Sequence, residues 1–355
     1  MVHSTAVGGT VLRRGAKPER MTPAVYAALR ANHGLITMRQ SIAAGLTPED
    51  VDALVKRGAW VAVRRGVYAE REVWERLDPH RGRPQWRSRA ASLNMVTPHV
   101  LSHDSAGLEL GMELLLPDPF MPHVTRPGVL GSRTKSGVKH HKAVFHPRQV
   151  LQANGFLVLD HARTAVDIAR EHGSPHGVVA CDAALRLGVS RRQLEQALVP
   201  MRNWPHVRRA RAAVDLADPG AESLGETLAR MLVEELGIGR PQTQFGITDG
   251  RREAWCDLRV GRHIFEFDGR IKYQRRQDGG VATRAPDEVV WHEKQRQDWV
   301  CGFGLGMSRI VWSDFWGENR RWARQRLARE YAQTLSRYGA SLDDLAEFII
   351  RRPRR

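Results

Sequence analysis

The stretch CDLRVGRHIFEFDGRIKY, residues 256–273, places three carboxylates among residues that favour strands. Asp257 lies in the first apolar run, and Glu266 and Asp268 lie in the second. Acidic residues are depleted in strands, so three of them in one pair of strands need an explanation. The pair Gly261-Arg262 separates the two runs, and glycine at the first central position suits a type II′ hairpin turn. The stretch therefore predicts a β-hairpin.

The two-residue turn fixes the register of this hairpin. Val260 is expected opposite His263, and counting outward places Asp257 directly opposite Glu266, with β-carbons roughly 5 Å apart. Asp268 follows Glu266 by two residues and is expected on the same face of the strand. The register therefore predicts three carboxylates on one face of the hairpin.

Carboxylates directly opposed across a sheet repel each other, so the fold must offset their charge. A Mg²⁺ or Mn²⁺ ion held by Asp257 and Glu266 would do so, and it would activate water for attack on a phosphodiester. The alternative is a solvent-facing edge hairpin whose acids pair with Arg259, Arg270 or Lys272. The pattern favours the metal site and leaves the alternative open.

Helical patterns flank the hairpin. In ESLGETLARMLVEELG, Ser223 is a candidate N-cap, and Glu226 is either a further acid of the metal site or the capping-box partner of Ser223. Downstream, a helix containing Arg296 precedes the apolar strand SRIVW. Arg296 is either a phosphate-binding residue or one half of a surface ion pair.

The chain is strongly basic. Among its 355 residues, 55 Lys and Arg against 39 Asp and Glu give a net charge of +16 and a pI near 10.7. This excess favours double-stranded DNA as a partner over a membrane, although a basic surface without a partner would have the same composition. The sequence has no apolar run long enough for a membrane span. With only three cysteines, it indicates no disulfide framework, and we expect a cytoplasmic protein.

The N-terminal part predicts a winged helix-turn-helix. Residues 1–20 form a basic arm that we expect to be disordered. In residues 21–75, three short helices with threonine N-caps precede two strands joined by a basic turn. The helix at 48–57 is the expected recognition helix. The expected DNA-binding residues are Lys56, Arg57, Arg64 and Arg65. A pure protein-interaction module is the alternative.

Residues 85–215 alternate short apolar runs with helical patterns, which predicts a mixed middle domain. Its histidines lack the spacing of a helical metal motif, so the sequence predicts no metal site there. The run Ser102 to Ser105 contains serine, histidine and aspartate, but neighbours in sequence are not expected to face one another as a catalytic triad must. Residues 319–355 predict a charged helix and a basic tail.

The overall prediction is a multidomain chain of mixed α/β (α+β) class whose residues 220–318 form a mixed sheet flanked by helices. This part resembles the PD-(D/E)xK nuclease superfamily, in particular the group close to very-short-patch-repair endonucleases. The residues that carry the resemblance are Ser223, Glu226, Asp257, Glu266, Asp268, Gly269, Lys272, Tyr273, Glu293, Arg296, Asp298 and the strand ending at Trp312. The resemblance implies Mg²⁺-dependent hydrolysis of DNA by Asp257, Glu266 and Asp268. Asp268 stands where the superfamily usually has lysine, and Lys272 is expected to act in that lysine's place.

The first part of the chain resembles another family. The stretch TMRQSIAAGLTPEDVDALVKRGAWVAVRRGVY is similar to the winged-helix domain of AbiEi-type antitoxins, and residues 85–215 resemble the domain that follows it. The resemblance implies binding of operator DNA and a nucleotidyltransferase-type toxin as a partner. Two hypotheses result: a winged helix that delivers a nuclease domain to DNA, and a non-enzymatic repressor or antitoxin with a degenerate nuclease fold.

Overall fold

The computed structural model describes residues 21–129, 131–269 and 286–351, with the backbone alone described for 286–290. The chain divides into two compact units, one ending at Val96 and the other beginning at Thr97. The predicted N-terminal arm, residues 1–20, lies outside the described residues. No helix in the described ranges is long and apolar enough to cross a membrane.

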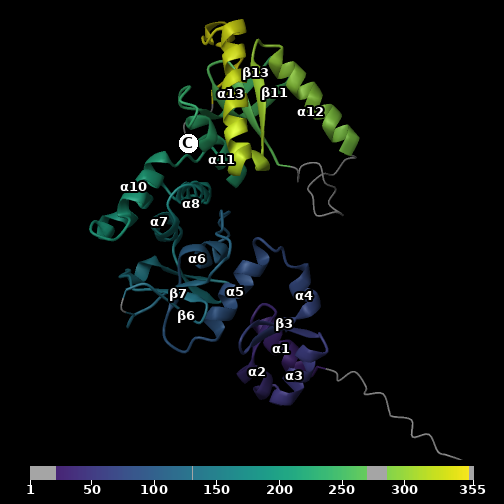
Figure 1. Cartoon of the computed structure of the whole chain (residues 1–355), viewed down its shortest axis with the longest axis vertical. Helices are drawn as coiled ribbons and strands as arrows, with labels where there is room; N and C mark the ends of the chain where they lie inside the picture. Colours follow the sequence, from purple (N-terminus) through teal and green to yellow (C-terminus); the bar gives the residue numbers. More distant parts are fainter. Residues whose placement is uncertain (1–20, 130, 270–285, 352–355) are drawn as a thin grey trace, which may run out of the picture. The chain divides into compact units, whose positions relative to one another are not determined.

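The first unit has the element order of a winged helix-turn-helix, as the sequence predicted (Figure 1). Its strands form a three-stranded sheet in the order β1-β3-β2. Three features went unpredicted: the short strand β1 between α1 and α2, the helix α4 directly after the sheet, and the assignment of residues 85–96 to this unit rather than to the middle domain. The elements are α1 (Pro23–Ala31), β1 (Leu35–Thr37), α2 (Met38–Ala43), α3 (Pro48–Lys56), β2 (Trp60–Arg64), β3 (Val67–Glu70), α4 (Arg71–Arg76) and α5 (Gly82–Leu93).

Side-chain caps begin the first three helices of this unit. Thr47 accepts a hydrogen bond from the N–H of Asp50, and the Asp50 carboxylate accepts one from the N–H of Thr47 at 2.8 Å. This capping box begins α3 at Pro48, as predicted. In α5, Trp86 is buried against the sheet, and this contact explains why the helix belongs to the first unit.

The second unit begins with a six-stranded sheet in the order β6-β7-β5-β4-β9-β8. Four helices, α7 to α10, form an apolar core with α6 next to this sheet. The elements are β4 (Val100–Leu101), α6 (His103–Glu109), β5 (His123–Thr125), β6 (Arg133–Lys135), β7 (Val138–His141), β8 (Val150–Ala153), β9 (Phe156–Leu159), α7 (His161–His172), α8 (His176–Arg186), α9 (Arg191–Leu198) and α10 (Val207–Leu216).

A five-stranded sheet, ordered β13-β12-β11-β10-β14, completes the unit. Only the pair β12–β13 is parallel. The helices α11 and α13 pack on one face, and the end of α12 packs on the other. The sequence did not predict β10 and β14. The elements are α11 (Leu224–Glu234), β10 (Gln242–Thr248), β11 (Glu253–Val260), β12 (His263–Asp268), α12 (Pro286–Cys301), β13 (Gly306–Val311), α13 (Gly317–Tyr338) and β14 (Ile349–Ile350).

One glycine sets the distance between α11 and the sheet. A β-carbon at Gly225 would lie 2.0 Å from the ring of Phe267, which β12 carries. Any larger residue would have to push the helix away, so glycine permits this close approach.

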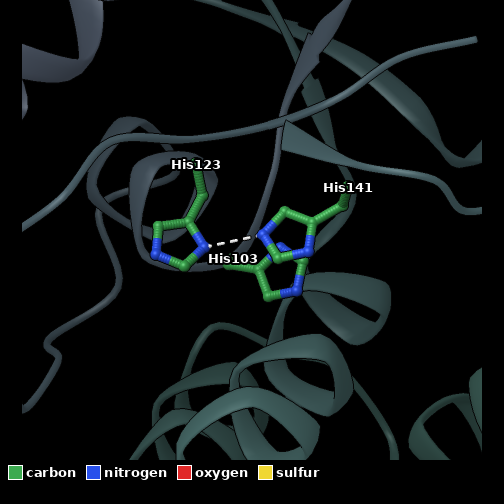
Figure 2. Close-up of side chains that lie close together, drawn as sticks. All are labelled: His103, His123 and His141. Carbon is green, nitrogen blue, oxygen red and sulfur yellow. Dashed lines mark hydrogen bonds between the residues drawn. The ribbon is translucent and has the colours of Figure 1, made fainter. Parts of the chain in front are cut away.

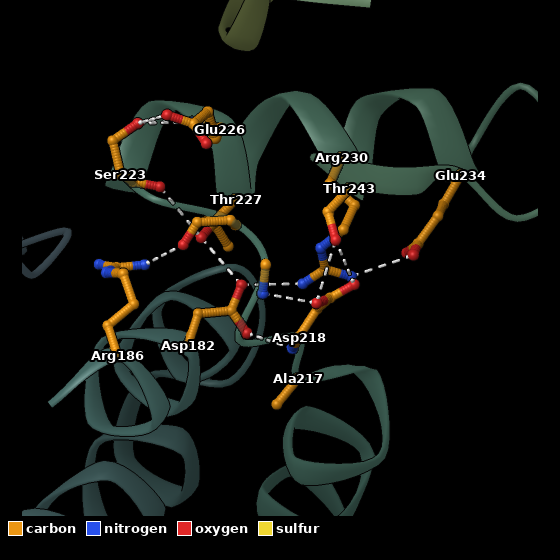
Figure 3. A network of polar contacts seen from close by, with 12 residues as sticks. Asp182, Arg186, Ala217, Asp218, Ser223, Glu226, Thr227, Arg230, Glu234 and Thr243 are labelled. Atoms are coloured by element: carbon orange, nitrogen blue, oxygen red, sulfur yellow. Dashed lines mark hydrogen bonds and ion pairs between the residues drawn. The ribbon is translucent and has the colours of Figure 1, made fainter. Parts of the chain in front are cut away.

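A buried ion pair joins the helical part of the second unit to α11 (Figure 3). Asp182 on α8 accepts hydrogen bonds from Arg230 Nη2 at 2.9 Å, from Thr227 Oγ1 at 2.9 Å and from the N–H of Asp218 at 2.7 Å. Both charged side chains are almost fully buried. Burial raises the pKa of Asp182, and the contacts with Arg230 and the other donors oppose this rise. Each charge therefore depends on the other to remain in the interior.

We expect Asp182→Ala to lower the free energy of unfolding of the second unit by about 3–5 kcal/mol, because it leaves the Arg230 guanidinium buried without its partner. Denaturant titrations would measure this loss. The matched control is Glu318→Ala, which removes an exposed ion pair with Arg321 and should cost several-fold less. Equal effects of the two substitutions would contradict the role given to Asp182.

Candidate functional site

The predicted carboxylates line one cavity in the second unit, with a volume of about 330 Å³. The cavity lies where β11, β12 and β13 meet α12. The described residues that line it include five carboxyl groups and two guanidinium groups, an excess of three acids. The lining consists of Glu253, Ala254, Trp255, Asp257, Glu266, Phe267, Asp268, Glu293, Arg296 and Arg309. This charge imbalance favours a cation in the cavity.

The hairpin register follows the prediction as far as Leu258, which pairs with Phe265. Beyond this pair, the Asp257 carboxylate takes the place of a backbone partner and accepts the N–H of Phe267 at 2.8 Å. On the other side of β11, the ladder is interrupted at Gln244, whose φ is +52°. The strand is therefore irregular at the point where Asp257 turns its side chain to the cavity.

Glu266 is the most buried of the three acids, with 8% of its surface exposed. Its Oε2 accepts a hydrogen bond from Arg296 Nη2 at 3.0 Å, whereas Oε1 is buried and has no N–H or O–H donor among the described residues. Burial and the charge of Asp257 raise the pKa of Glu266 to about 7, against the opposing effect of Arg296. Such a shift in a cavity is typical of functional carboxyl groups.

Two arginines balance part of this charge. Arg296 also binds Glu293 at 2.9 Å, so it bridges two carboxylates. Arg309 on β13 lies 3.5 Å from Asp268 and 3.5 Å from Glu293. Of the two predicted roles for Arg296, the structure contains the ion pair. Its partners, Glu266 and Glu293, both line the cavity.

Glu226 contacts Ser223 at the start of α11, but its carboxylate accepts the backbone N–H of Glu222 and not that of Ser223, so the predicted capping box is only half formed. Ser223 accepts the N–H of Glu226 at 3.1 Å, and the Glu226 carboxylate accepts the N–H of Glu222 at 2.7 Å. Burial raises the pKa of Glu226, and the charge of Asp257 adds to this effect. The charge of Asp257 therefore affects the pKa of Glu226, although Glu226 does not line the carboxylate cavity.

Two other predicted residues, Lys272 and Arg270, lie outside the described residues. Lys272 was predicted to replace the usual lysine.

The three acids of the hairpin do not form a compact trio. Among the described residues, the groups that bring three or more candidate ligand atoms within 4.8 Å of one another contain histidine, and Asp257, Glu266 and Asp268 are not one of these groups. A Mg²⁺ site needs only one or two protein carboxylates, so it does not require all three acids to come together.

In the first unit, the predicted DNA-binding residues lie at the end of α3 and at the β2–β3 turn. Lys56, Arg57 and Arg65 are exposed, and Arg64 is half-buried. The turn itself is anchored, since Asn94 donates a hydrogen bond to the carbonyl of Arg65 at 3.1 Å. A short, fixed turn with an exposed cation at its tip has the form of a wing that contacts phosphate.

The structure also assembles a buried cluster that sequence reasoning missed, formed by His103, His123 and His141. These residues belong to three different elements and are far apart in the chain, so spacing gives no signal for them. Within the run that the sequence analysis rejected as a triad, Ser102 Oγ lies 3.0 Å from His103 Nδ1. Asp104, however, bonds to His172 instead, so the run forms no triad.

The class of the N-terminal region follows from its sequence. Residues 24–71 match the family described as transcriptional regulator, AbiEi antitoxin. The match runs from the second residue of α1 to just past the end of β3, and so covers most of the predicted winged helix, residues 21–75. The N-terminal region is thus AbiEi antitoxin-like, and the family match ends well before the carboxylate cavity.

Relatives extend over more of the chain. The uncharacterized proteins Rv2248 and MT2308, from two strains of Mycobacterium tuberculosis, are each 27% identical to it over 264 residues, or 72% of this chain and 89% of theirs. The crystal structure of the RV2827C protein from Mycobacterium tuberculosis is similar at 18% identity with a TM-score of 0.34, covering 54% of this chain and 75% of that one.

Proposed function

We propose that the chain is a DNA-binding transcriptional regulator of the AbiEi type. The observation that carries this proposal is the family match over residues 24–71, which coincides with three helices and a wing. The net charge of +16 supports it, because cations that neutralise phosphates release counterions and so drive binding. In this proposal α3 enters the major groove, and Lys56, Arg57, Arg64 and Arg65 contact phosphates.

The exposed surface of α3 adds a detail. Its first turns carry Glu49 and Asp52, whereas its last turn carries Lys56. Acidic side chains repel phosphates but accept hydrogen bonds from cytosine N4 in the major groove. The acidic end of α3 therefore suits contact with bases, and the basic end suits contact with the backbone.

We expect the double substitution Lys56→Ala/Arg65→Ala to weaken binding of a random-sequence duplex and to reduce the salt slope of log Kd by about two, one for each phosphate contact. Fluorescence anisotropy between 50 and 200 mM salt would measure both. Arg76→Ala is the matched control, because Arg76 is exposed and paired with Glu72 on α4. A double variant that binds like the control would contradict the proposal.

We further propose that the carboxylate cavity hydrolyses DNA phosphodiesters with Mg²⁺ or Mn²⁺. Oε1 of Glu266 supports this, because a buried carboxylate oxygen that receives no N–H or O–H hydrogen bond from the described residues suits a cation. Asp257 and Glu266 would hold the ion, and Asp268 and Lys272 would assist. A bound divalent ion would supply activated water and charge stabilisation. Arg296 keeps Glu266 oriented, and Arg309 does the same for Asp268.

We expect the full-length protein to cut supercoiled plasmid with Mg²⁺ or Mn²⁺ and to stop in EDTA. Glu266→Ala/Asp268→Ala should slow cutting by about two orders of magnitude or more, since metal coordination contributes several kcal/mol to the transition state. The control is Glu253→Ala, an exposed acid on the rim of the same cavity. Cutting that survives in the double variant would assign it to a contaminant.

The alternative is a non-enzymatic regulator or antitoxin with a nucleotidyltransferase-type toxin as its partner. One observation favours it: Arg296 and Arg309 already occupy the carboxylates of Glu266 and Asp268. If the wild type binds duplex DNA but cuts no substrate with either metal, this alternative replaces the nuclease proposal.

A further inference from the structure

Three elements of the second unit bring three histidines into one buried cluster. His103 begins α6, His123 begins β5 and His141 ends β7. Figure 2 shows the three rings lying together, with Nδ1 of His123 and Nε2 of His141 3.0 Å apart. At most 5% of each residue is exposed. Three imidazoles in the interior without water need partners for their nitrogens.

Two of the rings have one nitrogen held by a serine hydroxyl, and the third ring lies near a carboxylate but beyond hydrogen-bond distance. Ser102 Oγ lies 3.0 Å from Nδ1 of His103, and Ser132 Oγ lies 3.2 Å from Nδ1 of His141. Asp104 Oδ2 lies 3.8 Å from Nε2 of His123. A histidine that binds a metal has its second nitrogen fixed in this way, which orients the ring. The other three nitrogens are Nε2 of His103, Nδ1 of His123 and Nε2 of His141.

Two of the three ring spacings suit a small cation. The centroid of the His123 ring lies 5.1 Å from those of His103 and His141, whereas the rings of His103 and His141 are stacked at 3.9 Å, so one of these two must rotate for all three to face one ion. One nitrogen from each ring lies within 4.8 Å of the others. Neighbouring ligand nitrogens around tetrahedral Zn²⁺ lie roughly 3.3 Å apart, given Zn–N distances of about 2.0–2.1 Å. The 3.0 Å between His123 and His141 is close to this value. His103 also has a φ of +51°, an uncommon conformation for a residue other than glycine, so the backbone is strained where it places this ring.

Asp104 adds negative charge behind the cluster. The residue is fully buried, its Oδ2 accepts a hydrogen bond from His172 at 2.7 Å, and its Oδ1 is buried without a partner among the described residues. Burial lowers the pKa of His103, His123 and His141.

We propose that His103, His123 and His141 bind one divalent transition-metal ion of the Zn²⁺ type. Imidazole ligands suit Zn²⁺ and its neighbours in the first row, whereas Mg²⁺ and Ca²⁺ prefer oxygen. His103 and His141 also line a cavity of about 630 Å³, which Lys142, Arg170 and His206 border. This cavity would supply water or an anion as a fourth ligand, which its bordering cations favour.

The test uses untagged full-length protein that has been stripped with a chelator and dialysed against Zn²⁺. We expect one Zn²⁺ per chain, and a tetrahedral visible spectrum when Co²⁺ replaces it. His141→Gln should weaken Zn²⁺ binding by about 100-fold or more, because it removes a ligand. Ser132→Ala should weaken it about 10-fold by releasing the His141 ring; Ser132 is exposed, so this variant keeps the fold.

The matched control is His206→Asn, which removes a histidine from the border of the same cavity and keeps a residue that tolerates the φ of +61°. This variant should bind Zn²⁺ like the wild type. Absence of Zn²⁺ from the wild type would overturn the proposal. So would equal binding by the wild type and Ser132→Ala, or loss of binding in His172→Gln without any loss in His141→Gln.

Discussion

The cost of burying a carboxylate shapes the second unit. A buried charge is tolerated only with a partner, and each of three buried acids has a different one. Asp182 has the guanidinium of Arg230, Glu266 has that of Arg296, and Asp104 has the imidazole of His172. The first pair satisfies its carboxylate completely and joins α8 to α11. The other two leave one oxygen buried without an N–H or O–H donor among the described residues. Glu266 lines the carboxylate cavity, and Asp104 lies beside the histidine cluster.

The two units separate charge in a way that suits DNA. The wing of the first unit exposes cations, whereas the cavity of the second collects an excess of acids. Cations attract the phosphate backbone from a distance, and acids attract the divalent ions that phosphate chemistry requires. A basic chain with one acidic cavity is therefore the arrangement expected if the N-terminal region binds DNA and the cavity acts on it. Arg296 and Arg309 oppose this arrangement, because they neutralise part of the negative charge of Glu266 and Asp268.

Local signals in the sequence predicted most elements, and long-range contacts account for what was missed. The turn at Gly261 fixed the hairpin register, and the capping box of Thr47 fixed the start of α3, because both depend on residues a few positions apart. The edge strand β14 depends on pairing with β10, roughly a hundred residues earlier, and has only two residues. The partner of Glu266 and the cluster around His123 likewise depend on tertiary folding, which spacing along the chain does not encode.

Anomalous X-ray diffraction from crystals grown with Mn²⁺ would test the central claim most directly, that the cavity between β11 and α12 is a divalent-metal site. The account predicts an anomalous peak within bonding distance of Glu266 Oε1 and of the Asp257 carboxylate, with Arg296 still on Glu266 Oε2. An empty cavity at saturating Mn²⁺, with Arg296 neutralising Glu266 as before, would contradict it. The carboxylate hairpin would then be a structural feature of a DNA-binding regulator.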